Sequence, residues 1–251
     1  MKWLLSALLV FATTAVACGG GPASPAAKPP VAAPPVIKYQ NTLPAQTMAG
    51  PFDLVQNVLD FAPGAASIVH THFTPNLATV LMGQIAVKSA AGDKQGSVGD
   101  GLVEPLNQPV QALNATSQET MVAVAFAVPH GSKPTAPVAG QPAPQVPNKT
   151  LYSFMQESVS VPAGFSLVQQ VLEFAPGSQT AGHRHGGSGV VTILHGQVTL
   201  NVDGVEKTYY AGDSFTELPS QTLRASNRGG DPAMLVASFA LPDGAQLTTN
   251  L

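Results

Sequence analysis

Two pairs of histidines carry the clearest chemistry in this sequence. His183 and His185 are separated by one residue, and so are His70 and His72. Residues two apart in a β-strand point to the same face, so each pair projects two imidazoles side by side if it lies in a strand. Paired imidazoles are a common beginning of a site for Zn, Mn, Fe, Ni or Cu. The sequence therefore predicts up to two divalent-metal sites.

The two histidine pairs lie in an internal repeat. Residues 52–85 and 165–198 share 16 identities in 34 positions without a gap, at a constant offset of 113 residues. The offset extends to later positions, such as Asn114 and Asn227. One offset over so long a span indicates duplication of a whole domain.

The elements that position the histidines are predicted to be short strands. Residues 52–61 alternate between apolar and polar and end at Ala62-Pro63-Gly64, a pattern typical of a strand followed by a turn. Further β-like runs follow at intervals in both repeats, and no segment keeps a helical period over three turns. The expected fold is all-β, a sandwich or barrel in each repeat.

One glutamate in each repeat is a candidate third ligand. Glu104 and Glu217 come two residues after the apolar Leu102 and Phe215, so strand alternation points them toward the core. A buried carboxylate is costly unless it is paired or bound to metal. Each glutamate could complete an open three-ligand site with its histidine pair. The alternative is a glutamate near a barrel mouth that accepts a hydrogen bond from the backbone or from a protonated histidine.

The spacing of glycines around the histidines resembles the first signature motif of the cupin superfamily. Gly177, His183, His185 and Gly196 follow that motif, and their counterparts 113 residues earlier follow it equally well. The second motif is visible around Gly212 and, in the first repeat, around residues 99–114. The resemblance implies a bicupin: two tandem cupin type-2 conserved barrels, each a small antiparallel jelly roll or double-stranded β-helix.

The chain departs from the metal-site pattern that the resemblance implies. The family's site takes a Glu from the first motif and a third His from the second. This chain has Asn76 and Gly189 at the glutamate positions, and Val110 and Leu223 at the histidine positions. Two imidazoles alone bind metal weakly, because protein sites generally supply three or four donors. The small residues at 186–189 predict easier access to the candidate metal site of the second barrel, because larger residues crowd the same stretch of the first.

The amino terminus has the features of an export signal. Lys2 precedes an apolar run at 4–16 that is too short to span a bilayer comfortably, and small residues follow at 15–17. Cys18, the single cysteine, then resembles the acylated cysteine of a bacterial lipobox, although Ala15 stands where Leu is usual. Plain cleavage after Ala17 is the alternative.

These features divide the chain into five segments. We expect a signal peptide at 1–17, a Pro/Gly-rich tether at 18–35, a first barrel at 36–129, a Pro-rich linker or exposed loop at 130–149 and a second barrel at 150–251. The expected location is the cell surface or periplasm as a lipoprotein, with secretion as the alternative. The membrane would then be contacted only through the lipid anchor.

Composition narrows the possible functions. Charged residues make up 10% of the chain and the net charge is −3, so no basic field attracts nucleic acid. We interpret the protein as an exported bicupin that binds a small molecule, with a divalent metal in the second barrel. The alternatives are a metal-dependent enzyme of the dioxygenase or isomerase class and a degenerate structural bicupin without metal. The ligand, the metal and the oligomeric state are left open.

Overall fold

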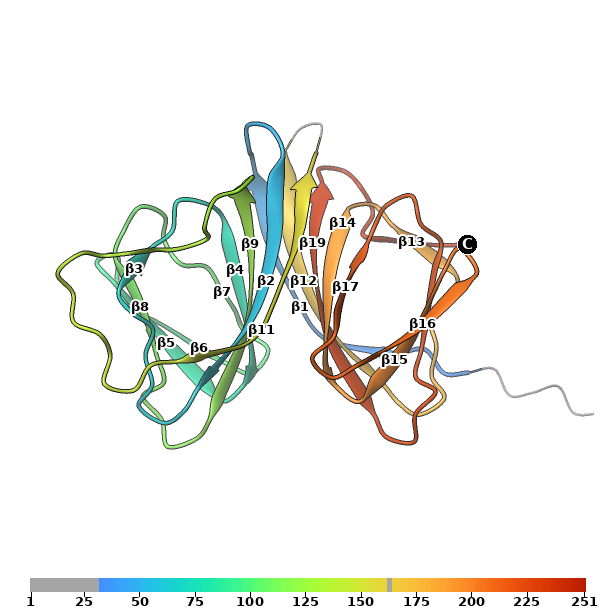
Figure 1. Ribbon diagram of the computed structural model, residues 1–251, viewed down its shortest axis with the longest axis horizontal. Coiled ribbons are helices and arrows are strands. Elements are labelled where there is room, and N and C mark those ends of the chain that lie inside the picture. The colour runs from blue at the N-terminus through green and yellow to red at the C-terminus, as the bar shows by residue number, and fades with distance from the viewer. Residues whose placement is uncertain (1–31, 162–163) are drawn as a thin grey trace, which may run out of the picture. The chain divides into compact units, whose positions relative to one another are not determined.

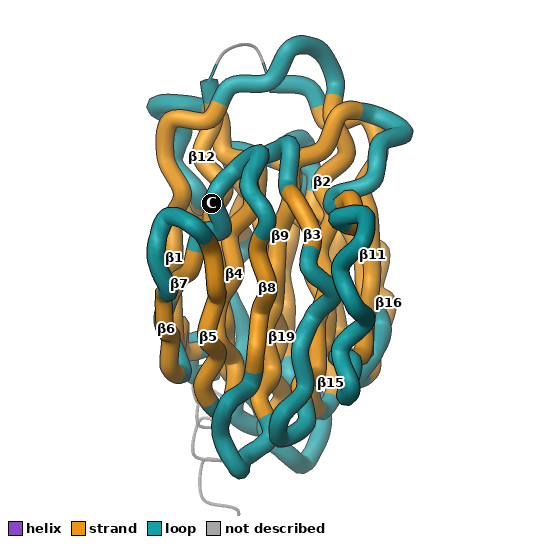
Figure 2. Tube along the Cα trace, turned by 90° about the vertical axis from the view of Figure 1, so that its left-hand side faces the viewer, coloured by secondary structure: helices purple, strands orange, loops and turns teal. Residues whose placement is uncertain are grey.

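The structure is a computed structural model that describes residues 32–161 and 164–251. The predicted signal peptide, Cys18 and most of the tether lie outside the described residues. The described chain consists of strands and turns without helices (Figure 2). It therefore contains no helix of the length and apolar character needed to cross a membrane.

The first barrel is formed by two five-stranded sheets. Its outer sheet has the order β10 (Ala136–Pro137), β3 (His70–Thr71), β8 (Val110–Leu113), β5 (Gln84–Ser89) and β6 (Lys94–Ser97). Its inner sheet has the order β11 (Lys149–Val159), β2 (Phe52–Phe61), β9 (Thr120–Pro129), β4 (Asn76–Met82) and β7 (Gly101–Leu102). Buried aliphatic and aromatic residues from both sheets fill the space between them.

The second barrel repeats this arrangement. Its outer sheet has the order β16 (Val205–Tyr210), β15 (Gln197–Val202), β18 (Leu223–Ser226), β13 (His183–His185) and β20 (Thr248–Asn250). Its inner sheet has the order β1 (Val36–Gln46), β12 (Phe165–Phe174), β19 (Ala233–Pro242), β14 (Ser188–His195) and β17 (Ser214–Glu217). All strand pairs in both barrels are antiparallel.

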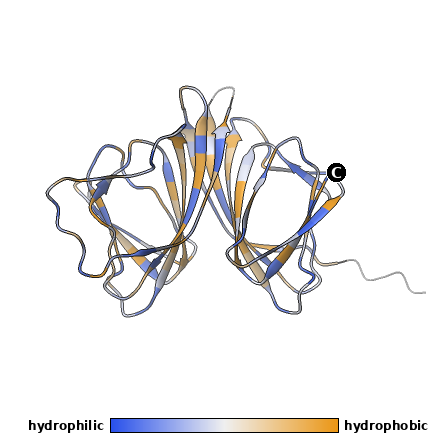
Figure 3. Ribbon diagram, viewed as in Figure 1, coloured by the Kyte–Doolittle hydropathy of each residue, from blue (hydrophilic) through white to orange (hydrophobic). Residues whose placement is uncertain are grey.

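The two inner sheets pack against each other. Phe52 and Phe165, twins in the repeat, stack with ring centroids 4.9 Å apart. Hydrophobic residues lie along these central strands (Figure 3). A buried polar network also crosses the contact, because Gln56 donates to Thr192 Oγ1 at 2.7 Å and Ser238 donates to Gln56. The two barrels therefore share one buried interface.

The first strand of each repeat belongs to the barrel of the other repeat. Strand β1 pairs with β12, from Val36 opposite Glu173 to Gln46 opposite Phe165 (Figure 1). Strand β11 pairs with β2 in the same way. The sequence analysis placed residues 36–46 in the first barrel and most of β11 in the second. The structure exchanges them, because period-2 alternation specifies the two faces of a strand and says nothing of its edge partner.

The segment predicted to be a linker, 130–149, packs along the first barrel. Strand β10 pairs with β3, Val138 N–H donates to Val69 O at 3.0 Å, and Ala66 N–H donates to Val146 O at 2.9 Å. The segment is the twin of the chain's C-terminal end, where β20 pairs with β13 at the same repeat positions. Each barrel is thus closed by a final two- or three-residue strand beside its histidines.

A buried aspartate ties the start of this segment to the end of strand β11. Asp53 accepts hydrogen bonds from His130 Nδ1 at 2.8 Å and from the N–H groups of Gly131 and Ser158, each at 3.0 Å. Burial by itself raises the pKa of Asp53, but these bonds outweigh it and the pKa lies below its ordinary value of 3.8. The bond to Asp53 raises the pKa of His130 above its ordinary 6.5.

This pair predicts a specific pH dependence of stability. Because the pKa of Asp53 is lowered by folding, its contribution is present above about pH 4 and is lost as the pH falls through its folded pKa. The contribution of His130 is present below about pH 6.5 and is lost as the pH rises through its raised pKa. Asp53→Asn should lower the free energy of unfolding by on the order of 2 kcal/mol at pH 5–6.

Urea unfolding of both proteins from pH 3 to 8 measures this difference. The difference in the free energy of unfolding between wild type and Asp53→Asn should be largest near pH 5–6, and should decrease below pH 4 and above pH 7. A gap that stays constant over the whole range would show that the charges of the pair do not matter.

Candidate metal centre

The three predicted ligands of the first barrel lie together. His72 Nε2 is 2.5 Å from Glu104 Oε2 and 3.0 Å from His70 Nε2. His70 Nε2 lies 3.6 Å from the same carboxylate oxygen. All three side chains are almost fully buried. Each offers one ligand atom, and these atoms lie within 4.8 Å of one another.

Backbone carbonyls orient both imidazoles of this cluster. His70 Nδ1 donates to Ile68 O at 2.8 Å, and His72 Nδ1 donates to Pro134 O at 3.0 Å. When both imidazoles are neutral with their protons on Nδ1, the two Nε2 atoms present lone pairs, which repel each other at 3.0 Å and also repel the Glu104 oxygen. In the metal-free site, a proton on Nε2 relieves this repulsion and supplies the hydrogen bond to Glu104. A cation between the two Nε2 atoms also removes this repulsion, and a bond from Nδ1 to a carbonyl is the usual support for a metal-binding histidine. The donor set therefore fits a divalent metal.

The electrostatics of the cluster favour a cation. Burial raises the pKa of Glu104, but hydrogen bonds from His70 and His72 outweigh this and lower it to about 2. Burial lowers the pKa of His70, yet the bonds to Glu104 and Ile68 raise it above its ordinary value. The Glu104 carboxylate is therefore ionised. Its negative charge stabilises a proton on the imidazoles or a metal ion bound between them.

Asn76 holds the carboxylate strand in place from the position where the cupin motif has its glutamate. Its Nδ2 donates to Glu104 O at 3.1 Å, and Glu104 N–H donates to Asn76 Oδ1 at 2.9 Å. Strand β7 ends at Leu102, so these two bonds take the place of ladder hydrogen bonds next to the ligand. The sequence analysis noted Asn76 only as a missing ligand, and its positioning role was missed.

Replacing Asn76 is expected to weaken metal binding more than its effect on stability explains. In Asn76→Ala the backbone of Glu104 loses both side-chain bonds, and metal affinity should fall about 10- to 100-fold. Competition with a fluorescent chelator measures the affinity, and thermal unfolding measures the stability.

Asn114→Ala is the matched control. Asn114 is equally buried and bonds the turn at Phe61 and Gln118, away from the cluster. This variant should lose comparable stability and keep its metal affinity. Equal affinity losses in the two variants would make Asn76 an ordinary structural residue.

The second set of predicted ligands is less tightly gathered. His185 Nε2 is 3.1 Å from Glu217 Oε2, and the rings of His183 and His185 are 4.9 Å apart between centroids. Burial lowers the pKa of His183, while the bond to Glu217 outweighs burial and raises that of His185. His183 Nδ1 donates to Ala181 O and His185 Nδ1 donates to Leu247 O. The second barrel thus repeats the orientation of the imidazoles, but its three candidate ligands do not form the compact cluster seen in the first barrel.

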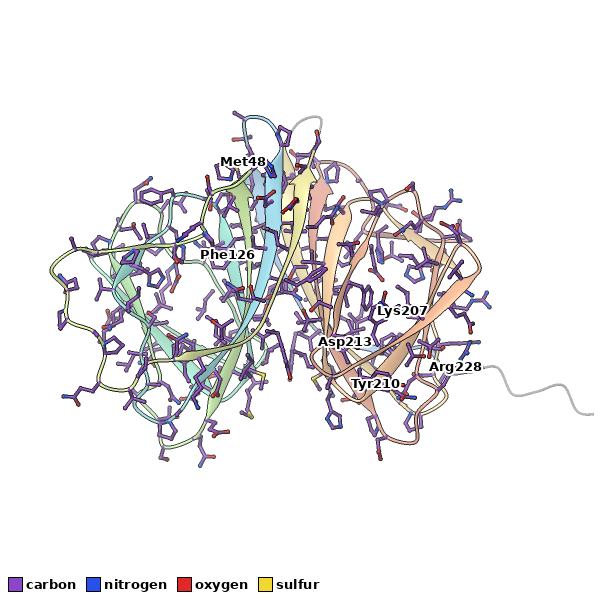
Figure 4. All side chains as sticks on the ribbon, viewed as in Figure 1. Met48, Phe126, Lys207, Tyr210, Asp213 and Arg228 are labelled. Atoms are coloured by element: carbon purple, nitrogen blue, oxygen red, sulfur yellow. The ribbon has the colours of Figure 1, made fainter. Side chains whose placement is uncertain are left out.

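An aromatic ring explains why the second set is more open. A Cβ at Gly189 would collide with the ring of Phe239, so this ring fills the space of the missing glutamate side chain. The same ring lies 4.5 Å from His185 between centroids. Figure 4 labels the twin of this ring, Phe126, in the first barrel. Phe126 lies farther from its histidine, with 5.4 Å between the ring centroids of His72 and Phe126. The positions of the missing third histidine are filled by buried aliphatic residues, Val110 opposite His70 and Leu223 opposite His183.

Each ligand set opens into its own cavity. The first-barrel cavity has a volume of about 400 Å³ and the second about 330 Å³. Both fall in the usual range of small-molecule sites. Side chains from both sheets line them, and most of the lining is apolar. Arg184, Arg224 and His195 are exposed.

Comparisons with known proteins bear on the fold. Residues 170–239 match the Cupin domain family. No curated protein matches the chain in sequence. A variant of Bacillus subtilis oxalate decarboxylase OxdC superposes with a TM-score of 0.60 at 14% identity, covering 86% of this chain and 80% of that one.

Two further oxalate decarboxylase structures are similar. The formate complex of the Lactobacillus farciminis enzyme gives a TM-score of 0.59 at 14% identity and covers 87% of this chain and 86% of its own. A B. subtilis oxalate decarboxylase characterised for its Mn(II) centres gives 0.56 at 14% identity, over 86% and 80%. The predicted fold of two antiparallel jelly-roll barrels is confirmed, and the match to the Cupin domain family lies within the second barrel.

Proposed function

We propose that this bicupin-fold protein is exported and binds a small molecule through a divalent metal in its first barrel. The convergence of His70 Nε2, His72 Nε2 and Glu104 Oε2 carries the proposal. Two nitrogens and one carboxylate oxygen form an open three-ligand set, which leaves coordination positions for a ligand from the adjoining cavity. Mn, Fe, Ni, Cu and Zn all accept such donors.

The sequence analysis favoured a metal site in the second barrel, and the proposal places it in the first barrel instead. Flexible glycines near the second histidine pair suggested easier access there. Solvent access to a metal site is less important than the close approach of its donor atoms. In the second barrel, Phe239 occupies the space that a further donor would need. The first barrel instead uses Asn76 to hold its carboxylate against the histidines.

A metal-dependent enzyme is the second candidate. A bound metal at this site would act as a Lewis acid or an oxygen-activating centre. The carbonyls of Ile68 and Pro134 would orient the two imidazoles that hold the metal, and the apolar cavity wall would exclude water. The shared fold with oxalate decarboxylases favours small carboxylic acids as the first compounds to screen, although one fold hosts many reactions. A degenerate bicupin without metal is the remaining alternative.

Export through the signal at 1–17 is part of the proposal, with lipidation at Cys18 preferred over plain cleavage after Ala17. Mass spectrometry of the protein from a bacterial host distinguishes the two. A diacylglyceryl-modified Cys18 at the mature amino terminus supports the anchor, and an unmodified Cys18 would mean secretion.

Metal binding is tested on the purified protein after chelator treatment. Calorimetric titration with Mn²⁺, Fe²⁺, Ni²⁺, Cu²⁺ and Zn²⁺ should show one equivalent bound for at least one metal. A metal present at a hundred times its Kd should stabilise the fold by about 2.7 kcal/mol, which raises the melting temperature. Failure of all five metals to bind would contradict the proposal and favour the degenerate bicupin.

A further inference from the structure

The cavity of the second barrel is closed by the segment that leads out of the tether. Pro34, Pro35 and Ile37 line this cavity, and Ala33 O accepts a hydrogen bond from Gln179 N–H at 3.0 Å. The C-terminal strand β20 borders it on another side. The cavity of about 330 Å³ is therefore a pocket built from three separate parts of the chain.

The wall of this pocket is mainly apolar. Leu172, Phe174, Val191 and Leu235 line it together with Phe239, and most of these side chains are buried in the hydrophobic core of the second barrel. Such a wall favours the apolar body of a ligand through the burial of nonpolar surface. No lysine or arginine lines the pocket to attract an anionic body.

The polar groups that line the pocket are the two histidines and Glu217, together with Gln170, Thr180, Thr248 and Asn250. His183 Nδ1 is used by Ala181 O, so Nε2 carries the lone pair on the side of the pocket. Glu217 also lines the pocket, and one of its oxygens is occupied by His185. The second carboxylate oxygen and His183 Nε2 are left as acceptors for a ligand that brings a donor.

The same groups do not form the compact set seen in the first barrel. There, three ligand atoms lie within 4.8 Å of one another around a single position. In the second barrel, the ring of Phe239 lies beside His185 and fills the space of the residue-189 side chain. The duplicated cavities have therefore diverged, one toward metal donors and the other toward an apolar pocket with acceptors.

We propose that the second barrel binds, without metal, a small uncharged molecule with an apolar body and one hydroxyl group, such as a phenol or an aliphatic alcohol. The hydroxyl donates to His183 Nε2 or Glu217, and the body lies against Phe174 and Leu235. This site is separate from the proposed metal centre, and its ligand does not depend on that centre.

Calorimetric titration of the full-length protein in excess EDTA tests the site, with 4-propylphenol and 4-propylanisole as probes. The two compounds share an apolar body, but the ether has no donor. The phenol should bind with one site per chain and about tenfold more tightly than the ether. EDTA removes metal from the first barrel, so failure of the metal proposal leaves this result unchanged.

Variants locate the site. His183→Phe keeps the volume of the ring but removes one of the two acceptors, and should reduce the preference for the phenol. His183→Phe/Glu217→Leu removes both acceptors and should reduce the ratio of the two affinities to about one. Ala237→Phe fills the pocket and should abolish binding of both probes. Ile37→Trp, at an exposed position on the rim, should weaken both without affecting the core. Arg224→Ala, exposed and on the same barrel, is the control that should bind like wild type.

Three results would overturn the proposal. One is the absence of saturable binding by 4-propylphenol and its shorter homologues in the wild-type protein. Another is equal affinity for phenol and ether, which would reduce the site to a hydrophobic cavity. The third is binding that survives in both Ala237→Phe and Ile37→Trp, which would place the phenol elsewhere.

Discussion

Replacing His70 and His72 together with alanine is expected to reduce the bound metal from about one equivalent to a trace. Both Nε2 donors disappear, and Glu104 alone offers a single ligand. Loss of a residue that only supports a ligand costs about 10- to 100-fold in affinity, so loss of two ligands should cost on the order of a thousandfold or more. Elemental analysis of protein purified without chelator or affinity metal measures the content directly.

The twin change in the second barrel separates the two sites. His183→Ala/His185→Ala removes the same residue types from the same repeat positions, and the protein should keep about one equivalent of metal. Metal lost from this variant but retained without His70 and His72 would return the centre to the second barrel. Circular dichroism and thermal unfolding of both variants show whether a loss of metal reflects a loss of fold.

Expression of residues 149–251 alone is expected to yield a dimer. This fragment contains the second barrel except for β1, together with β11, whose natural partner is β2 of the first repeat. Strands β1 and β11 are twins at the 113-residue offset, so β11 of one copy can pair with β12 of another. Both copies gain an edge strand and bury the inner-sheet surface that Phe165 presents.

A shorter fragment provides the control. Residues 165–251 lack β11, so neither copy can complete the other's sheet, and the inner face stays exposed. We expect light scattering to show a dimer for the longer fragment at micromolar concentration and aggregates or unfolded chains for the shorter one. A stable monomer from residues 149–251 would show that the exchanged strand is dispensable.

The repeat and the strand alternation were sufficient to predict the fold class and which candidate ligands lie near one another. Both glutamates were placed on the core side from the apolar residues two positions earlier, and both lie beside their histidines in the structure. This worked because alternation is a local property of the strand. The histidine pairs project to one side for the same reason.

Three-dimensional relations between distant segments could not be predicted in this way. Nothing in the pattern of residues 36–46 distinguishes β12 from β2 as the partner strand. Likewise, Asn76 reads as a lost ligand in the motif, and only the structure brings its amide to the backbone of Glu104. The difference between the two sites depends on the ring of Phe239, which lies 50 positions after Gly189 in the sequence.

The exchange of β1 and β11 also determines the order in which the chain can fold. The first barrel lacks an edge strand until residues 149–159 have emerged, and β1 must wait for residues 165–174 before it has a partner. Contacts that close over more than a hundred residues are formed slowly, because the loop-closure entropy is lost before they stabilise anything. Each barrel is therefore incomplete without a strand from the other repeat, and the two should unfold in one cooperative transition. Under the proposed export, the first barrel stays incomplete until residues 149–159 have crossed the membrane.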